Sequence, residues 1–327
     1  MNYFFKTVIF LASLFAVGSC SKTEQITIES TKEITYGVSL VEGILTFIDE
    51  STFENYVLQL NLENLDEWEN SINFYSLRSL INDNNKGISE ESQDFTQFPT
   101  ESMRFCSILN HNNIVQVGNW IFKLNFEKRE VWAISEQDKF LVNNLINDKY
   151  NKEKMLVFSF EDNIFEMLDA ENIEKARCKE SCAFSTQDVV PDNDNYWYCD
   201  ANGDEYGAEL KSDLDNLGIW KHLYTKFKHR KKGALNASDE YVLFDVYFDY
   251  YWKKKCKKET DSGTEQIQIN LFGNLSQPSS GRTYRKDHYE GTRCLSKYSL
   301  ESSVMFIEAL DCGGSLHTLN TNKIDNL

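Results

Sequence analysis

The sequence lacks most of the features that would divide the chain or mark an enzyme. It holds only three prolines among 327 residues, so proline gives little help in placing domain boundaries. It has no G-x-S-x-G, no H-E-x-x-H and no glycine-rich phosphate loop, and function classes defined by those motifs are therefore not indicated. After residue 17 no apolar run approaches the roughly 20 residues that a membrane-spanning helix needs.

The first residues, by contrast, carry a targeting pattern. One positive charge, Lys6, precedes the short apolar run "TVIFLASLFAV", as in a secretory signal. The following "VGSC" resembles the bacterial lipobox, and this resemblance implies cleavage before Cys20 and acylation of its thiol and new amino group. We predict a lipoprotein signal peptide over 1–19, lipid attachment at Cys20 and a polar tether over 20–36. The alternative is an ordinary secretory signal with a cysteine there by chance.

The bulk composition is that of a folded globular chain, with 41% hydrophobic and 26% charged residues. The net charge of −17 is unevenly spread, because Lys211 to Lys297 contains 17 basic and 11 acidic residues. Such asymmetry indicates either a charged partner or two parts of opposite sign that attract each other, and we favour the second. An exported acidic protein is poorly suited to bind nucleic acid, and no nucleic-acid partner is expected.

The cysteine pattern predicts disulfides. Cys106 lies apart from the others and is predicted to be a buried free thiol. Six further cysteines follow residue 177, and an even cluster in an exported protein is typical of disulfide bonding. Their connectivity stays open, since six cysteines allow 15 pairings. The predicted set is Cys178, Cys182, Cys199, Cys256, Cys294 and Cys312.

Residues 37–170 are predicted to form an acidic α+β domain with a β-meander. A short strand ends near Phe47, and Asp49 or Ser51 is placed to cap the helix that follows. Apolar residues then recur at helical spacing through two helices. Further along, Gly118-Asn119 lies between two alternating segments and suits a hairpin turn.

Residues 175–327 are predicted to form a basic, cysteine-containing, antiparallel β-rich domain of sandwich type. "YVLFDVYFDYYW" alternates strictly, and "EQIQINL" and "SSVMFIEAL" continue the scheme. Ahead of them, "IWKHLYTKFKHRKKG" places its apolar residues at helical spacing and predicts an amphipathic helix. The fold class is thus α+β, with a junction near 165–185.

The basic side of that predicted helix is the candidate surface for an anionic partner, such as a membrane or a phosphate. An ordinary core-packed helix with cations near its C-terminus has the same pattern, and we favour that interpretation. The candidate residues are Lys221, Lys228, His229, Arg230, Lys231 and Lys232.

Metal and sugar sites are not favoured. "CDANGDEYGAEL" begins like a calcium loop, but Glu205 and Lys211 stand where a glycine and a bidentate glutamate are required. Cys178 and Cys182 form only one loose pair, which falls short of a structural zinc site. Aromatic residues in alternating strands more often pack a core than stack on sugars. No metal or cofactor is expected.

Two segments carry a family resemblance. Gly43 to Leu80, with "SLR", and Asn113 to Leu124, with "IVQVG", resemble the N-terminal part of uncharacterised envelope lipoproteins of Bacteroidetes-type bacteria. Similar proteins also carry a segment like "LGIWKHLYTKFKHRKKG" ahead of a β-rich end. The resemblance covers about a third of the chain and brings no catalytic residue with it.

This resemblance implies a cell-envelope protein held by lipid on Cys20. The absence of an acidic run after Cys20 favours the periplasmic face of the outer membrane, with surface exposure as the alternative. We expect a non-enzymatic binding or assembly module whose partners are other envelope proteins or glycans. The alternatives are a carbohydrate-active or other hydrolytic enzyme, and a glycan-binding lipoprotein.

Overall fold

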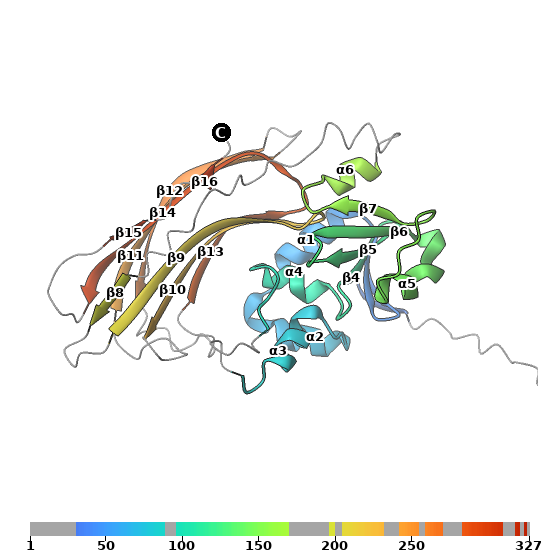
Figure 1. Ribbon diagram of the computed structural model, residues 1–327, viewed down its shortest axis with the longest axis horizontal. Coiled ribbons are helices and arrows are strands. Elements are labelled where there is room, and N and C mark those ends of the chain that lie inside the picture. The colour runs from blue at the N-terminus through green and yellow to red at the C-terminus, as the bar shows by residue number, and fades with distance from the viewer. Residues whose placement is uncertain are drawn as a thin grey trace, which may run out of the picture.

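The computed structural model describes residues 31–88, 96–169, 196–199, 205–231, 242–254, 259–270, 283–309, 318–320 and 324–325. The described chain is α+β, as predicted. A seven-stranded sheet with helices on both faces occupies one end, and two smaller antiparallel sheets face each other at the other end (Figure 1). The predicted signal peptide and most of the cysteine cluster lie outside the described residues.

The seven-stranded sheet follows the order of the chain, and all neighbours are antiparallel except β3 and β4. The tether prediction is wrong for its last residues, because Thr31–Thr35 forms edge strand β1, whose backbone pairs with β2 despite polar side chains. The strands are β1 (Thr31–Thr35), β2 (Val38–Val41), β3 (Ile44–Phe47), β4 (Ile114–Val117), β5 (Trp120–Asn125), β6 (Glu130–Ser135) and β7 (Leu156–Ser159).

Helices cover both faces of this sheet because side chains of a strand alternate between them. On β5, Phe122 joins the large core beneath α1 to α4, whereas Ile121 joins a smaller core beneath η2 and α5. Asp49 caps α1 as predicted and accepts a 2.7 Å bond from the backbone N–H of Thr52. The helices are α1 (Glu50–Gln59), η1 (Leu62–Asn64), α2 (Leu65–Ile72), α3 (Leu77–Asn84), α4 (Met103–Ile108), η2 (Glu136–Leu141), α5 (Val142–Ile146) and α6 (Ile164–Leu168).

The other two sheets form a sandwich of long strands in the orders β13-β10-β9-β8 and β12-β11-β14-β15, with β16 also on β14. Leu214 and Leu223 of the first sheet pack with Leu300 of the second. The alternating segments are strands as predicted. They are β8 (Tyr196–Cys199), β9 (Glu205–Asn216), β10 (Lys221–Lys231), β11 (Val242–Lys254), β12 (Thr260–Asn270), β13 (Thr283–Gly291), β14 (Leu295–Ala309), β15 (Thr318–Asn320) and β16 (Ile324–Asp325).

The predicted amphipathic helix is wrong, since Lys221–Lys231 is strand β10 in the middle of its sheet. Leu223 lies in the core between the two sheets, whereas Lys226 on the opposite face forms an ion pair with Glu101 of the N-terminal part. Both faces of the strand are therefore covered. A strand buried on both sides loses its polar alternation, and the remaining apolar spacing imitates a helix.

The turn between β9 and β10 joins the sandwich to the seven-stranded part. Leu217, Ile219 and Trp220 belong to the large core under α1 to α4, and the backbone N–H of Gly218 donates to the carbonyl of Phe160 over 2.9 Å. The predicted domain junction near 165–185 falls largely on residues outside the described ranges. Within those ranges, no helix is both long and apolar enough to span a bilayer.

Candidate functional site

Lys221, the first residue of the predicted anionic-partner surface, is not on the surface. Its side chain is 0% exposed, and its Nζ lies 2.5 Å from the carbonyl oxygen of Gly218 and 3.4 Å from that of Phe160. Burial lowers the pKa of this amine to about 7. The prediction for Lys221 is wrong because the residue starts an inserted strand rather than a solvated helix face.

The side chains of the other five residues of that predicted surface lie outside the described part of the structure. Lys228, His229, Arg230 and Lys231 have described backbone in β10, without described side chains, and Lys232 lies outside the described residues. The surface stays a prediction for those five positions.

The cysteines fall into two described environments. Cys294 is disulfide-bonded. Cys106 is a buried free thiol, as predicted, and burial raises its pKa, which disfavours the reactive thiolate. The side chains of Cys20, Cys178, Cys182, Cys199, Cys256 and Cys312 lie outside the description.

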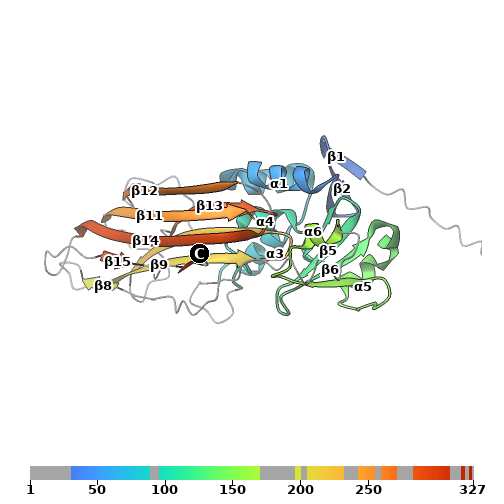
Figure 2. The ribbon, with the colours of Figure 1, turned by 90° about the horizontal axis from the view of Figure 1, so that it is seen from above.

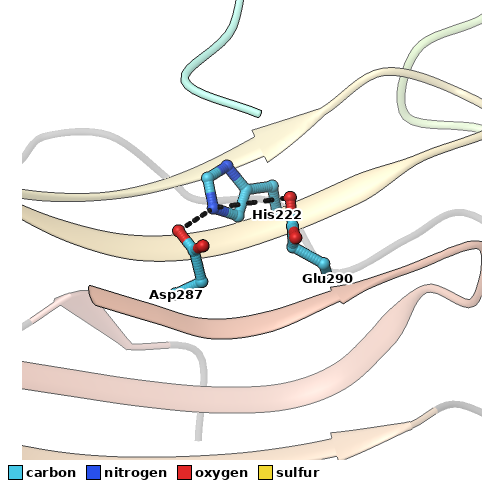
Figure 3. A group of neighbouring side chains, drawn as sticks. All are labelled: His222, Asp287 and Glu290. Atoms are coloured by element: carbon cyan, nitrogen blue, oxygen red, sulfur yellow. Dashed lines mark hydrogen bonds and ion pairs between the residues drawn. The ribbon is translucent and has the colours of Figure 1, made fainter. Parts of the chain in front are cut away.

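The structure brings together a group of titratable side chains that the sequence did not assemble. His222 of β10 faces Asp287 and Glu290 of β13 (Figure 3). Its Nε2 lies 2.8 Å from Oδ1 of Asp287 and 3.9 Å from Oε1 of Glu290. The imidazole is fully buried.

A local irregularity in β13 makes this arrangement possible. Residues 287 and 290 are three apart, so a regular strand would turn their side chains to opposite faces. Leu223 pairs with Tyr289 and Tyr224 with Asp287, which leaves His288 as an extra residue in β13. A bulge of this kind re-aims side chains, and here it puts both carboxylates on the face that His222 occupies.

Cations and a hydroxyl group surround the two carboxylates. Nη1 of Arg104 lies 2.8 Å from Oε2 of Glu290 and 3.6 Å from Oδ2 of Asp287. Nε of Arg285 lies 3.0 Å from Asp287, and the hydroxyl of Ser102 donates to Glu290 over 2.6 Å. The carboxylates are thus already neutralised by guanidinium groups.

A third carboxylate, Asp215 of β9, approaches the other ring nitrogen. Its Oδ2 lies 4.0 Å from Nδ1 of His222 and accepts a bond from the Thr100 hydroxyl over 2.6 Å. Burial raises the pKa of Asp215. Burial would also raise the pKa of Asp287, but its hydrogen bond with His222 and the charge of Arg285 together lower it to about 2.

The donor set resembles that of a metal site, because one ligand atom from each of His222, Asp287 and Glu290 lies within 4.8 Å of the others. Two facts oppose a divalent cation there. Arg104 and Arg285 already place positive charge against the carboxylates, and the imidazole has no exposed surface. We therefore interpret the cluster as a buried ionic junction between the residue 100–104 segment and the sandwich.

Further ion pairs join the same two parts of the chain. Lys226 pairs with Glu101 at 2.9 Å, and Arg293 pairs with both Glu50 and Glu166 at 3.1 Å. In each case the cation comes from the basic segment and the carboxylate from the acidic one. These pairs agree with the favoured interpretation of the charge asymmetry, whereas at the His222 junction the cation Arg104 comes from the acidic segment and the carboxylates from the basic one.

A second polar group lies between the two sheets of the sandwich. Thr225 Oγ1 lies 3.1 Å from Nε2 of His288 and 2.9 Å from Oγ of both Ser212 and Ser302. A hydroxyl beside an imidazole is the start of a nucleophile and base pair. These side chains are all buried, however, and burial lowers the pKa of His288 to about 4, so the group is a neutral internal network.

One cavity borders the ionic junction. Its volume is about 310 Å³, and Asp215, whose carboxylate lies 4.0 Å from Nδ1 of His222, is one of its lining residues. The lining combines aromatic and charged side chains. It is formed by Pro99, Phe126, Arg129, Phe160, Glu161, Asp213, Leu214, Asp215, Asn216 and Leu217.

Comparison with known proteins does not assign the chain to a family. No family model matches the chain, and no curated protein matches it. Among solved structures, it is similar to a DUF4848 family protein from Bacteroides thetaiotaomicron at 8% identity. That match covers 89% of this chain and 98% of the other, with a TM-score of 0.21. A likeness at this level carries no conclusion about activity.

Proposed function

We propose that this protein is a lipid-anchored cell-envelope protein that acts as a non-enzymatic binding or assembly module. The anchor rests on the lipobox-like "VGSC" before a polar segment. We further propose two domains, 37–170 and 175–327, and a location at the outer membrane that faces the periplasm.

The closed state of the His222 junction carries the non-enzymatic part of this proposal. A catalytic group must reach its substrate, directly or through one water molecule. His222 is fully buried, and Arg104 and Ser102 already occupy the carboxylate oxygens of Glu290. Side chains buried and paired in this way hold the sandwich against the helices, as a rigid binding scaffold requires.

Co-purification tests the proposal. The tagged protein would be gently solubilised from membranes beside a Cys20→Ala variant, and the captured proteins would be compared. A stoichiometric envelope partner that is lost with the unanchored variant supports an assembly role. Capture of the wild-type protein alone, under conditions that preserve known envelope complexes, would contradict it.

The cavity favours a second candidate function, hydrolysis of a carbohydrate or related substrate. Asp213 and Asp215 are two residues apart on β9 and both line the cavity. The raised pKa of Asp215 suits a general acid. Turnover in a glycoside panel that Asp215→Asn abolishes, while Asp148→Asn retains it, would establish this function in place of the first.

A further inference from the structure

Several large apolar side chains remain exposed in the layer that covers the outer face of the seven-stranded sheet. Phe140 in η2 is 66% exposed, Ile146 in α5 is 36% exposed, and Tyr150 just after α5 is 52% exposed. We call these three residues the aromatic end surface. Lys154 places its Nζ 4.9 Å from the centre of the Phe140 ring, so a cation stands beside the exposed ring.

This surface lies next to the point where the described chain begins. Thr31 pairs with Val41 in the β1–β2 hairpin, so the start of β1 lies beside the turn that contains Glu42. The carboxylate of Glu42 lies 3.9 Å from Nζ of Lys139, the neighbour of Phe140. Figure 2 shows β1 and α5 at the end of the molecule opposite the far ends of β11 and β14, on opposite edges of that end.

The proposed anchor limits how far this end can lie from a bilayer. Ten residues, 21–30, separate Cys20 from Thr31. A fully extended chain of that length spans at most about 40 Å. A lipid on Cys20 therefore keeps the start of β1 within about 40 Å of the membrane, so the aromatic end surface can reach it.

The chemistry of the surface suits the headgroup region. Aromatic side chains concentrate at membrane–water interfaces, and lysines can bury their stems while their ammonium groups reach the phosphates. Exposed lysines accompany the aromatic residues at Lys149 and Lys152. Acidic residues such as Asp148 lie nearby as well, so the attraction comes from the apolar side chains and not from net charge.

We infer that Phe140, Ile146 and Tyr150 dock on the phospholipid headgroup region of the membrane that holds the anchor, with the sandwich directed away from it. This inference rests on the proposed lipidation of Cys20. Docking fixes the orientation of the protein, which attachment through one lipidated residue alone would not.

Fluorescence quenching by lipid tests the inference. The full-length protein would be placed in vesicles of phosphatidylethanolamine and phosphatidylglycerol that contain brominated acyl chains. Phe140→Trp adds an indole at the proposed contact, and Tyr75→Trp adds one at an exposed position before α3 as the matched control. We expect the fluorescence added by Phe140→Trp to be quenched roughly two-fold or more beyond that added by Tyr75→Trp.

Equal quenching of the two variants would overturn the docking. Shielding of the Phe140→Trp indole from solvent that depends on protein concentration and persists without lipid would also overturn it. A second copy of the chain would then cover the surface. Mass spectrometry of Cys20 separates the two proposals. If Cys20 carries acyl chains and the two variants are quenched equally, the anchor is supported and the docking surface is refuted. If Cys20 is not acylated, the anchor is refuted. The surface is then still tested with vesicles added from outside.

Discussion

The indole of Trp220 stacks on the ring of Phe105, with the ring centres 5.7 Å apart and the planes within 4° of each other. Trp220 ends the turn between two strands of the sandwich, and Phe105 belongs to α4 of the helical layer. Phe53 of α1 also contacts the indole, in an edge-to-face arrangement with the ring centres 5.7 Å apart. The hydrophobic core of the seven-stranded part therefore contains residues that arrive from the sandwich.

Trp220→Ala is expected to lower the free energy of unfolding by about 3–5 kcal/mol, because it removes a large ring from a packed core. Urea unfolding would be followed by near-ultraviolet and far-ultraviolet circular dichroism. We expect both signals to shift together, since the turn links the strands of the sandwich to the core of the seven-stranded part. Tyr36→Ala, at an 86% exposed position, is the control and should change little. Two separate transitions in the unfolding curve would show that the two parts unfold separately.

Gly218 cannot be replaced at this turn without strain. Its φ is +73°, and an added Cβ would lie 2.5 Å from Val131 Cγ2 and 2.7 Å from Ile164 Cδ1. Gly43 has a similar φ of +76°, and no atom lies within 4 Å of a Cβ added there. Gly43→Ala therefore measures the cost of the positive φ alone, without a steric clash. We expect Gly218→Ala to lose about 1–3 kcal/mol more than Gly43→Ala in thermal or urea unfolding. Equal losses would mean that the turn has room to adjust.

Arg104→Met should destabilise the protein by about 3 kcal/mol, because it leaves the buried carboxylate of Glu290 without its guanidinium partner. Glu290→Gln in the same chain should recover much of that loss. The measurement is a double-mutant cycle in urea. If the two substitutions add independently, Arg104 does not neutralise Glu290 in solution.

The stability of the protein should rise with pH in the alkaline range because of Lys221. The folded pKa of this amine is about 7, below the usual value of 10.5, so the unfolded chain binds more protons between these values. The free energy of unfolding then rises over that window, by an amount on the order of 5 kcal/mol. Lys221→Met should be more stable near neutral pH and lack the rise. Lys152→Met, an exposed control, should keep it.

The opposite end of the pH range should report on His288. Its folded pKa is about 4, below the usual 6.5, so the unfolded chain takes up the proton first as the pH falls. Stability should therefore decline between about pH 6.5 and about pH 4, by roughly 3 kcal/mol at most. His288→Leu should flatten this decline, and His111→Leu, at an exposed ring, should not. An unchanged slope in the first variant would show that His288 is not the group that titrates.

Local sequence patterns predicted the elements that have one solvent-exposed face or a defined helix cap. The Asp49 cap, the Gly118 hairpin turn and strand β11 depend on neighbours in sequence, and each was predictable. Strand β10 was not, because burial of both faces removed its alternation. Strand β1 was missed for a different reason, since its polar residues are held by backbone pairing that composition does not reveal.

The His222 junction could not be assembled from sequence at all. Its histidine and Asp287 are 65 residues apart, and the bulge at His288 that aligns the two carboxylates is a property of strand register. The one available signal was the presence of Asp287 and Glu290 inside a strand that is otherwise partly aromatic. Charges in such a strand indicate a buried partner without naming it.

The insertion of Trp220 also has a consequence for the order in which the chain acquires structure during synthesis. The first 169 residues contain all seven strands of their sheet, yet their core stays incomplete until residues 217 to 220 have followed. Long-range contacts of this kind slow folding. A chain that emerges N-terminus first therefore lacks part of its core until the turn has followed, which would suit the passage through a membrane that the proposed lipoprotein signal requires.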